Sequence, residues 1–267
     1  SDRARYGLLF TMAQDKSGVD VDMDTLIRQS YIYYKGEPET KYYGLSQYYM
    51  GKYYFLNDST TQCEECFRNV INNAKERGDI DLQCLALEKL SRSIVLGNTK
   101  MSIAYARQGL ALYKTSKTRN LSNVVSYTLN LAFSFAMDNQ KDSAFAYLRQ
   151  AKGMLNSKID KEVIADVYHI HSGVYNYFDE TDSALYYSRK ALEVMHSDKL
   201  LISYAFCLQK SDSLEAAEKI LRDCVKRCSN QQKYTLYMDL CKMSGKRLFD
   251  KQHSDDIDSL DKYTEMY

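Results

Sequence analysis

The chain has 267 residues, of which 45% are apolar and 27% charged, with a formal net charge of +1. One proline and 11 glycines are too few for the many tight turns of an all-β sandwich or barrel. The near-zero net charge removes the simplest electrostatic case for nucleic-acid binding by this segment. No apolar run approaches the roughly 18 residues of a membrane-spanning helix. A chain of this length can bury a large core, in one or two globular units or in one elongated array.

Apolar residues recur at helical spacing along most of the chain. They stand three and four residues apart, and short polar segments such as 57–59 and 179–182 interrupt them. This pattern predicts an all-α protein made of amphipathic helices. We expect one domain spanning residues 1–267, with flanking helices in 1–39, five helix pairs in 40–229, and flanking or capping helices in 230–267.

The helices repeat in sequence. Asp142–Ala151 is identical to Asp182–Ala191 at six of ten positions, at an offset of 40 residues. The same frame fits upstream and downstream segments. Five copies therefore begin at a small residue: Cys63, Ser102, Ala144, Ala184 and Ala217.

Each copy has a matching pair of residues on the preceding helix. About twelve residues before the small residue stands another one: Gly51, Ser91, Ala132, Ser172 or Ala205. Three residues further along stands a large apolar one: Tyr54, Ile94, Phe135, Tyr175 or Leu208. Small residues let two helix backbones approach closely, and large residues fill the gaps beside them. The pattern predicts five closely packed helix pairs.

This pattern resembles the tetratricopeptide repeat. The third copy matches that family best, with Ala132, Phe135, Ala144, Leu148 and Ala151 at its characteristic positions. The Trp and the terminal Pro of the family are absent from all five copies. The resemblance implies a right-handed superhelical α-solenoid of antiparallel helix pairs.

The first 60 residues point to one group of proteins within the tetratricopeptide family. Asp2–Leu9, Asp20–Ile27 and Tyr48–Tyr54 are similar to segments of tetratricopeptide lipoproteins from Gram-negative gut anaerobes. This likeness implies a location in the cell envelope, in the periplasm or on an outer-membrane lipoprotein. Membrane association would then require a lipid anchor or a helix outside this segment.

A catalytic or metal site finds little support in the sequence. It contains no Gly-rich phosphate loop, no His-Glu-x-x-His and no Gly-x-Ser-x-Gly motif. His169 and His171 are two residues apart and point in different directions on a helix, and His171 falls on a core position. Cys63 and Cys66 have the spacing of zinc ligands but lack a second pair nearby, so we expect small buried residues. We therefore predict a non-enzymatic protein with no cofactor and no bound metal.

One arginine recurs at the same position of each second helix. One interpretation is a solvent-exposed outer face without a binding function, on which the arginines pair with neighbouring acidic side chains. The alternative is a basic ladder for an acidic partner or an anionic lipid surface. The row consists of Arg68, Arg107, Arg149, Arg189 and Arg222.

The resemblance also implies a concave groove lined by the first helix of each pair. This lining mixes aromatic and polar side chains, which suits a peptide or an extended protein segment. The same residues could instead pack against an adjacent helix. The carboxylate-gripping pattern of chaperone-binding members is not reproduced, because only Lys52 falls on a related position. The predicted groove residues are Tyr48, Lys52, Phe55, Glu88, Arg92, Leu129, Phe133, His169, Asn176, Tyr177, Phe206 and Gln209.

Together these features predict a protein-interaction scaffold whose partner is a protein or peptide. From the N-terminal likeness we expect the sensory or regulatory part of an envelope lipoprotein. The alternative is a cytoplasmic transcriptional regulator of the tetratricopeptide type that senses a peptide or small ligand.

Overall fold

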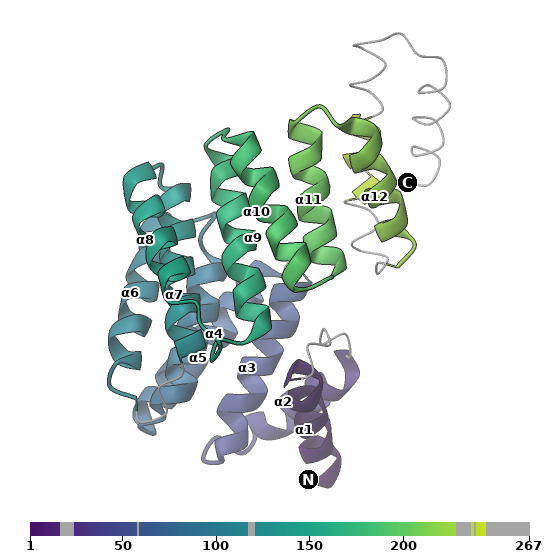
Figure 1. Ribbon diagram of the computed structural model, residues 1–267. Helices are drawn as coiled ribbons and strands as arrows, with labels where there is room; N and C mark the ends of the chain where they lie inside the picture. The colour runs from purple at the N-terminus through teal and green to yellow at the C-terminus, as the bar shows by residue number, and fades with distance from the viewer. Residues whose placement is uncertain (17–23, 58, 117–120, 228–235, 238, 244–267) are drawn as a thin grey trace. The chain divides into compact units, whose positions relative to one another are not determined.

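The computed structural model describes residues 1–16, 24–57, 59–116, 121–227, 236–237 and 239–243. Within these ranges twelve α-helices are named α1 to α12, residues 236–237 and 239–243 are helical as well, and no described residue lies in a β-strand (Figure 1). None of the described helices is both long and apolar enough to cross a lipid bilayer. Most of the predicted capping helices in 230–267 lie outside the described residues.

The helices divide between two compact units, Ser1–Met154 and Leu155–Tyr267, called here unit 1 and unit 2. Unit 1 contains α1 (Asp2–Lys16), α2 (Asp24–Lys35), α3 (Lys41–Leu56), α4 (Thr60–Glu76), α5 (Ile80–Ser93), α6 (Thr99–Tyr113), α7 (Leu121–Met137) and α8 (Lys141–Gly153). Unit 2 contains α9 (Lys161–Tyr177), α10 (Thr181–Val194), α11 (Asp198–Lys210) and α12 (Leu214–Val225). The single domain expected from the sequence stays a prediction, because repeats contact only their neighbours and divide readily into compact units.

Within each unit, consecutive helices pack side by side as antiparallel pairs joined by short turns. The small residues predicted to bring the helices together are all buried. The Ser102 hydroxyl of α6 donates to the backbone carbonyl of Ser91 in α5, at 2.7 Å. The Ser172 hydroxyl of α9 donates in the same way to the carbonyl of Ala184 in α10, at 2.9 Å. Such contacts require close backbones, and the predicted packing motif is confirmed at these pairs.

The large motif residues form a recurring aromatic contact. In unit 1, the Phe135 ring stacks on Tyr147 with centroids 5.4 Å apart and an interplanar angle of 9°. In unit 2, Tyr175 stacks on Tyr187 at 5.3 Å and 9°. In both cases the first ring belongs to the first helix of a pair and the second ring to its partner helix. Aromatic stacking thus accompanies the close approach of the small residues.

The turn inside three helix pairs is built alike. One residue in the left-handed region ends the first helix: Asn139 (φ 56°), Asp179 (φ 58°) or Asp212 (φ 57°). Asn and Asp tolerate this backbone conformation better than most residues. The next residue donates its N–H to a carbonyl five positions back, that of Phe135 (2.8 Å), Tyr175 (2.9 Å) or Leu208 (2.9 Å). The large motif residue therefore also accepts the hydrogen bond that closes its helix.

His171, Cys63 and Cys66 are buried and pack in the protein interior, as predicted. His171 is 3% exposed, its Nδ1 lies 2.7 Å from the Val167 carbonyl, and its ring packs 4.7 Å from that of Tyr187. Cys63 and Cys66 are buried on α4. Burial raises the pKa of the Cys63 thiol to about 11 and that of Cys66 to about 12, so both stay protonated and unreactive at neutral pH.

Candidate functional site

The predicted groove residues all lie on the first helices of their pairs, namely α3, α5 and α7 in unit 1 and α9 and α11 in unit 2. In unit 1, α3 contacts α5, and α5 contacts α7. The flanking helix α1 also contacts α3 and so extends the same row. In unit 2, α9 contacts α11. Each unit therefore brings its predicted groove residues onto neighbouring helices.

Three of the predicted groove residues in unit 1 are enclosed. Tyr48 is 4% exposed, Glu88 8% and Leu129 3%. The Tyr48 ring packs 5.9 Å from that of Phe67 in α4, which places it in the core between α3 and its partner helix. The prediction that Tyr48 and Leu129 line the groove is wrong, because neighbouring residues enclose both side chains. Glu88 is buried as well, but it holds charged neighbours at the surface.

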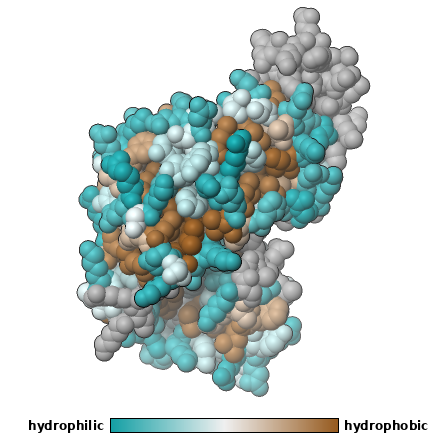
Figure 2. Space-filling view, viewed as in Figure 1, coloured by the Kyte–Doolittle hydropathy of each residue, from teal (hydrophilic) through white to brown (hydrophobic). Residues whose placement is uncertain are grey.

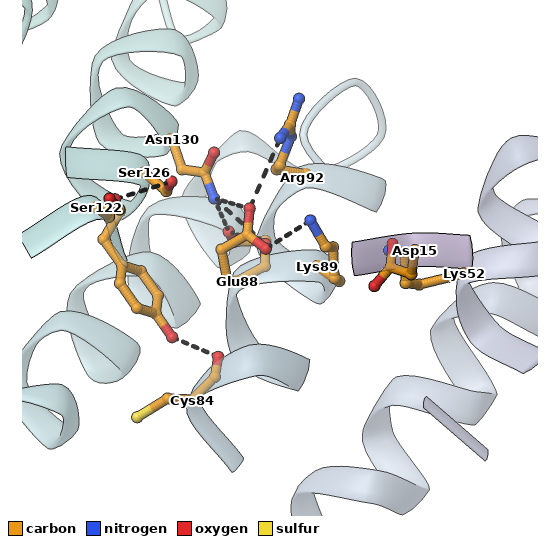
Figure 3. Close-up of polar contacts among 11 residues, drawn as sticks. Asp15, Lys52, Cys84, Glu88, Lys89, Arg92, Ser122, Ser126 and Asn130 are labelled. Carbon is orange, nitrogen blue, oxygen red and sulfur yellow. Dashed lines mark hydrogen bonds and ion pairs between the residues drawn. The ribbon is translucent and has the colours of Figure 1, made fainter. Parts of the chain in front are cut away.

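Glu88 is the centre of a buried polar network (Figure 3). Lys89 Nζ lies 2.9 Å from Glu88 Oε2, and Arg92 Nη1 lies 3.7 Å from Oε1. The Asn130 amide, from α7, donates to the Glu88 backbone carbonyl at 3.2 Å and to the Ser91 hydroxyl at 3.1 Å. The network thus connects α5 to α7 with side chains that are polar and mutually satisfied.

The charge of Glu88 depends on its two cationic neighbours. Burial by itself would raise the pKa of the Glu88 carboxyl, but the Lys89 ammonium and the Arg92 guanidinium outweigh it and hold that pKa below its ordinary value. Glu88 is therefore ionised at neutral pH, and it orients Lys89 and Arg92, whose side chains are 24% and 30% exposed.

A second ion pair lies next to this network. Lys52 of α3 binds the Asp15 carboxylate at the end of α1, and its ammonium lies 5.8 Å from the Tyr49 ring. Burial, together with the neighbouring Asp15 carboxylate, raises the pKa of Tyr49. Burial and the nearby Lys89 ammonium lower the pKa of Lys52. We call Asp15, Lys52, Glu88, Lys89, Arg92 and Asn130 the charged cluster.

Unit 2 presents uncharged side chains at the corresponding positions. Tyr177 is 43% exposed, and His169, Phe206 and Gln209 are half-buried. The Asn176 Oδ1 atom is enclosed and has no hydrogen-bond partner within the described residues. A buried acceptor without a donor is costly, because the oxygen has lost its hydrogen bonds to water.

Neither the protein-family models nor the curated protein sequences give a match to this chain. Solved structures do. NprR in complex with its cognate peptide NprX has a TM-score of 0.67 at 14% identity, covering 98% of this chain and 77% of that chain. The apo form of the quorum sensor NprR from B. thuringiensis has a TM-score of 0.63 at 15% identity, covering 95% and 72%. A signal-transduction ATPase with a tetratricopeptide repeat sensor, from Pyrococcus horikoshii, has a TM-score of 0.56 at 11% identity, covering 99% and 42%.

The fold is a tetratricopeptide-like α-solenoid. At these identities the likeness concerns the fold alone. The predicted all-α solenoid of helix pairs is confirmed, and the residues that act in it are argued from their own contacts.

The arginines of the second helices mostly contact neighbouring side chains of the solenoid. Arg68 donates to the Tyr105 hydroxyl at 2.7 Å, and Arg107 lies 5.5 Å from the centre of the Phe135 ring. In unit 2, Arg189 Nε donates to the Tyr204 hydroxyl at 3.3 Å. Arg222 Nε donates to the Glu218 carboxylate at 2.7 Å. Arg149 is exposed. These contacts favour the interpretation that the arginines lie on an outer face and pair with neighbouring side chains of the solenoid. Their partners are more often aromatic residues than acidic ones.

Three members of the charged cluster are not among the site residues predicted from the sequence. Lys89 and Asn130 each stand one residue after a predicted groove position, and only the rotation of the helix decides which neighbour faces the cluster. Asp15 belongs to α1, which precedes the five detected repeats. In the sequence, Asp15 is marked only as an acidic residue that follows the largely apolar stretch 6–13.

No metal site is added by the structure. Among the residues that it describes, no three or more His, Cys, Asp or Glu side chains are gathered so as to hold a metal ion.

Proposed function

We propose that this chain is a non-catalytic module that binds an extended peptide or protein segment along its first helices. The observation that carries the proposal is the arrangement in unit 1 of Lys52, Arg92 and Phe133. They come from three neighbouring helices, are only partly buried, and stand on a packed layer that includes Tyr48 and Leu129. Arginine and aromatic side chains are enriched at protein interfaces, and a rigid base lowers the cost of ordering them on binding.

The surface supports the same proposal. The face seen in Figure 2 carries hydrophobic patches bordered by hydrophilic side chains. Phe55 at the end of α3 is 38% exposed, and Tyr177 at the end of α9 is 43% exposed. Apolar surface with a polar rim is typical of interaction sites. The likeness to NprR, solved with a bound peptide, is consistent with this use of the fold.

Two biological settings fit such a module. The N-terminal segments Asp2–Leu9 and Asp20–Ile27 support the regulatory part of an envelope lipoprotein. The fold likeness to a quorum sensor supports the second setting, a cytoplasmic regulator that senses a peptide. The full-length gene separates the two, because a lipobox signal belongs to the first and a helix-turn-helix domain to the second.

A peptide-display library tests the binding function. We expect selected peptides to bind the wild-type chain and to bind a Phe133→Ala, Tyr177→Ala, Phe206→Ala variant at least about tenfold more weakly. The matched control replaces three exposed residues that lie off the first helices, Leu96, Met101 and Tyr186, by Ala. Equal affinity of both variants, or the selection of no peptide at all, would contradict the proposal.

A further inference from the structure

The charged cluster has an excess of positive charge. Lys52, Lys89 and Arg92 are its three cations, and Asp15 and Glu88 its two carboxylates. Glu88 is shared by Lys89 and Arg92, and Arg92 lies at the longer distance of 3.7 Å. Lys52 and Lys89 are close enough to repel each other. Partly buried like charges interact strongly because solvent screens them poorly, so a further carboxylate would be attracted here.

One of the two carboxylates, that of Asp15, comes from the flanking helix α1, which precedes the five helix pairs. Asp15 reaches Lys52 from the last turn of α1, and the two side chains remain 29% and 18% exposed. The body of α1 is fixed to α2, where the Ser30 hydroxyl donates to the Ala4 carbonyl at 2.8 Å. Gly7 approaches α2 so closely that an added Cβ would lie 2.8 Å from the Leu26 carbonyl oxygen. Asp15 can therefore leave Lys52 by a side-chain rotation while α1 stays in place.

We propose that an acidic segment of the partner binds between Lys52 and Lys89, and that Asp15 is an internal competitor which this segment displaces from Lys52. The inference rests on the proposed function and adds the partner's chemistry and a built-in control of affinity. Asp15 already shows that a carboxylate fits on Lys52 beside the Tyr49 ring. The half-buried Phe133 and the exposed Phe55 on the same row of helices favour a protein segment over a free anion.

An acidic peptide measures the competition directly. Fluorescence anisotropy with labelled hexaglutamate compares the wild-type chain with Asp15→Asn and with Asp15→Ser, which removes the same carboxylate with a smaller side chain. The matched control is Asp2→Asn, which makes the same change of charge at the exposed other end of α1. We expect both Asp15 variants to bind roughly tenfold more tightly than the wild type. Asp2→Asn should match the wild type, and Lys52→Gln should lose binding.

Several results would overturn the inference. These are equal affinity of the Asp15 variants and Asp2→Asn, absence of hexaglutamate binding in every variant, or displacement of hexaglutamate by an equal concentration of inorganic phosphate, which would indicate a free-anion site. The library-selected peptides, measured on the same proteins, keep the two proposals apart. If one of those hexaglutamate results occurs while the selected peptides still bind the wild type and fail with the Phe133, Tyr177, Phe206 variant, the binding function holds and only the acidic-partner inference falls.

Discussion

Units 1 and 2 share their packing and differ in what their first helices present. Both contain a stacked aromatic pair, Phe135 with Tyr147 and Tyr175 with Tyr187, in nearly identical geometry. Both also contain a turn closed by a hydrogen bond to the first residue of that pair. These contacts belong to the positions that repeat in the sequence.

The exposed positions of the first helices do not repeat. At the partly exposed position that follows each small motif residue, unit 1 places Lys52, Arg92 and Phe133, whereas unit 2 places Gly173 and Phe206. The comparison teaches that repetition identifies the scaffold and that departure from repetition identifies the recognition surface. Residues that pack must match their neighbours in every pair, while residues that face a partner are free to differ.

The largest expected effect tests the shared packing. Phe135→Ala should lower the free energy of unfolding by about 3 kcal/mol, because a nearly buried ring leaves a cavity. Tyr175→Ala should cost less, about 2 kcal/mol, because this side chain is only half-buried. Urea denaturation of each variant provides the measurement. A cost below about 1 kcal/mol in either unit would break the equivalence of the two stacks.

The next effect tests the difference between the units. Glu88→Gln should cost about 2 kcal/mol, because it removes the buried counter-ion of Lys89 and Arg92. The control is Glu193→Gln in unit 2, whose ion pair with Lys190 is exposed, so its cost should stay below about 0.5 kcal/mol.

The same carboxyl gives a pH signature. The pKa of Glu88 is lower in the folded chain than in the unfolded chain, where it is about 4.3. Its contribution is therefore complete above the unfolded-state pKa and is lost as the pH falls through the lower folded-state pKa. Denaturation at a series of acidic pH values should show this loss in the wild type and its absence in Glu88→Gln. Parallel pH profiles would contradict the assignment.

A smaller effect concerns the second helices. Arg107→Gln should cost about 0.5 kcal/mol by removing the cation from the Phe135 ring. Arg149→Gln, at the equivalent position of α8, is the matched comparison and should be nearly neutral. Thermal denaturation of both variants measures the difference. If the two substitutions reduced peptide binding strongly and stability not at all, the basic-ladder interpretation would be favoured.

The fold was predictable because its determinants recur. Ser91 with Ser102 and Ser172 with Ala184 follow nearly the same spacing, 11 and 12 residues, and a recurring spacing distinguishes a packing rule from chance. The site was predictable only in part. Successive residues of a helix point about 100° apart, so an error of one position exchanges a residue of the polar network for a packed apolar residue, as with Asn130 and Leu129.

The role of Asp15 could not be predicted from the repeat spacing. Asp15 has no equivalent among the five copies, and its contact with Lys52 depends on how α1 packs on α3. The aromatic partners of Arg68 and Arg189 likewise come from neighbouring helices, which sequence spacing within one helix does not identify.

Backbone hydrogen exchange tests the central claim, that partners bind along the first helices. The chain is measured alone and saturated with a library-selected peptide. We predict slower exchange in α3, α5 and α7 of unit 1, because a bound segment stabilises the helices that it contacts. The second helices α4, α6 and α8 should change little. Protection confined to those second helices, or no protection anywhere along unit 1 and unit 2, would contradict the account.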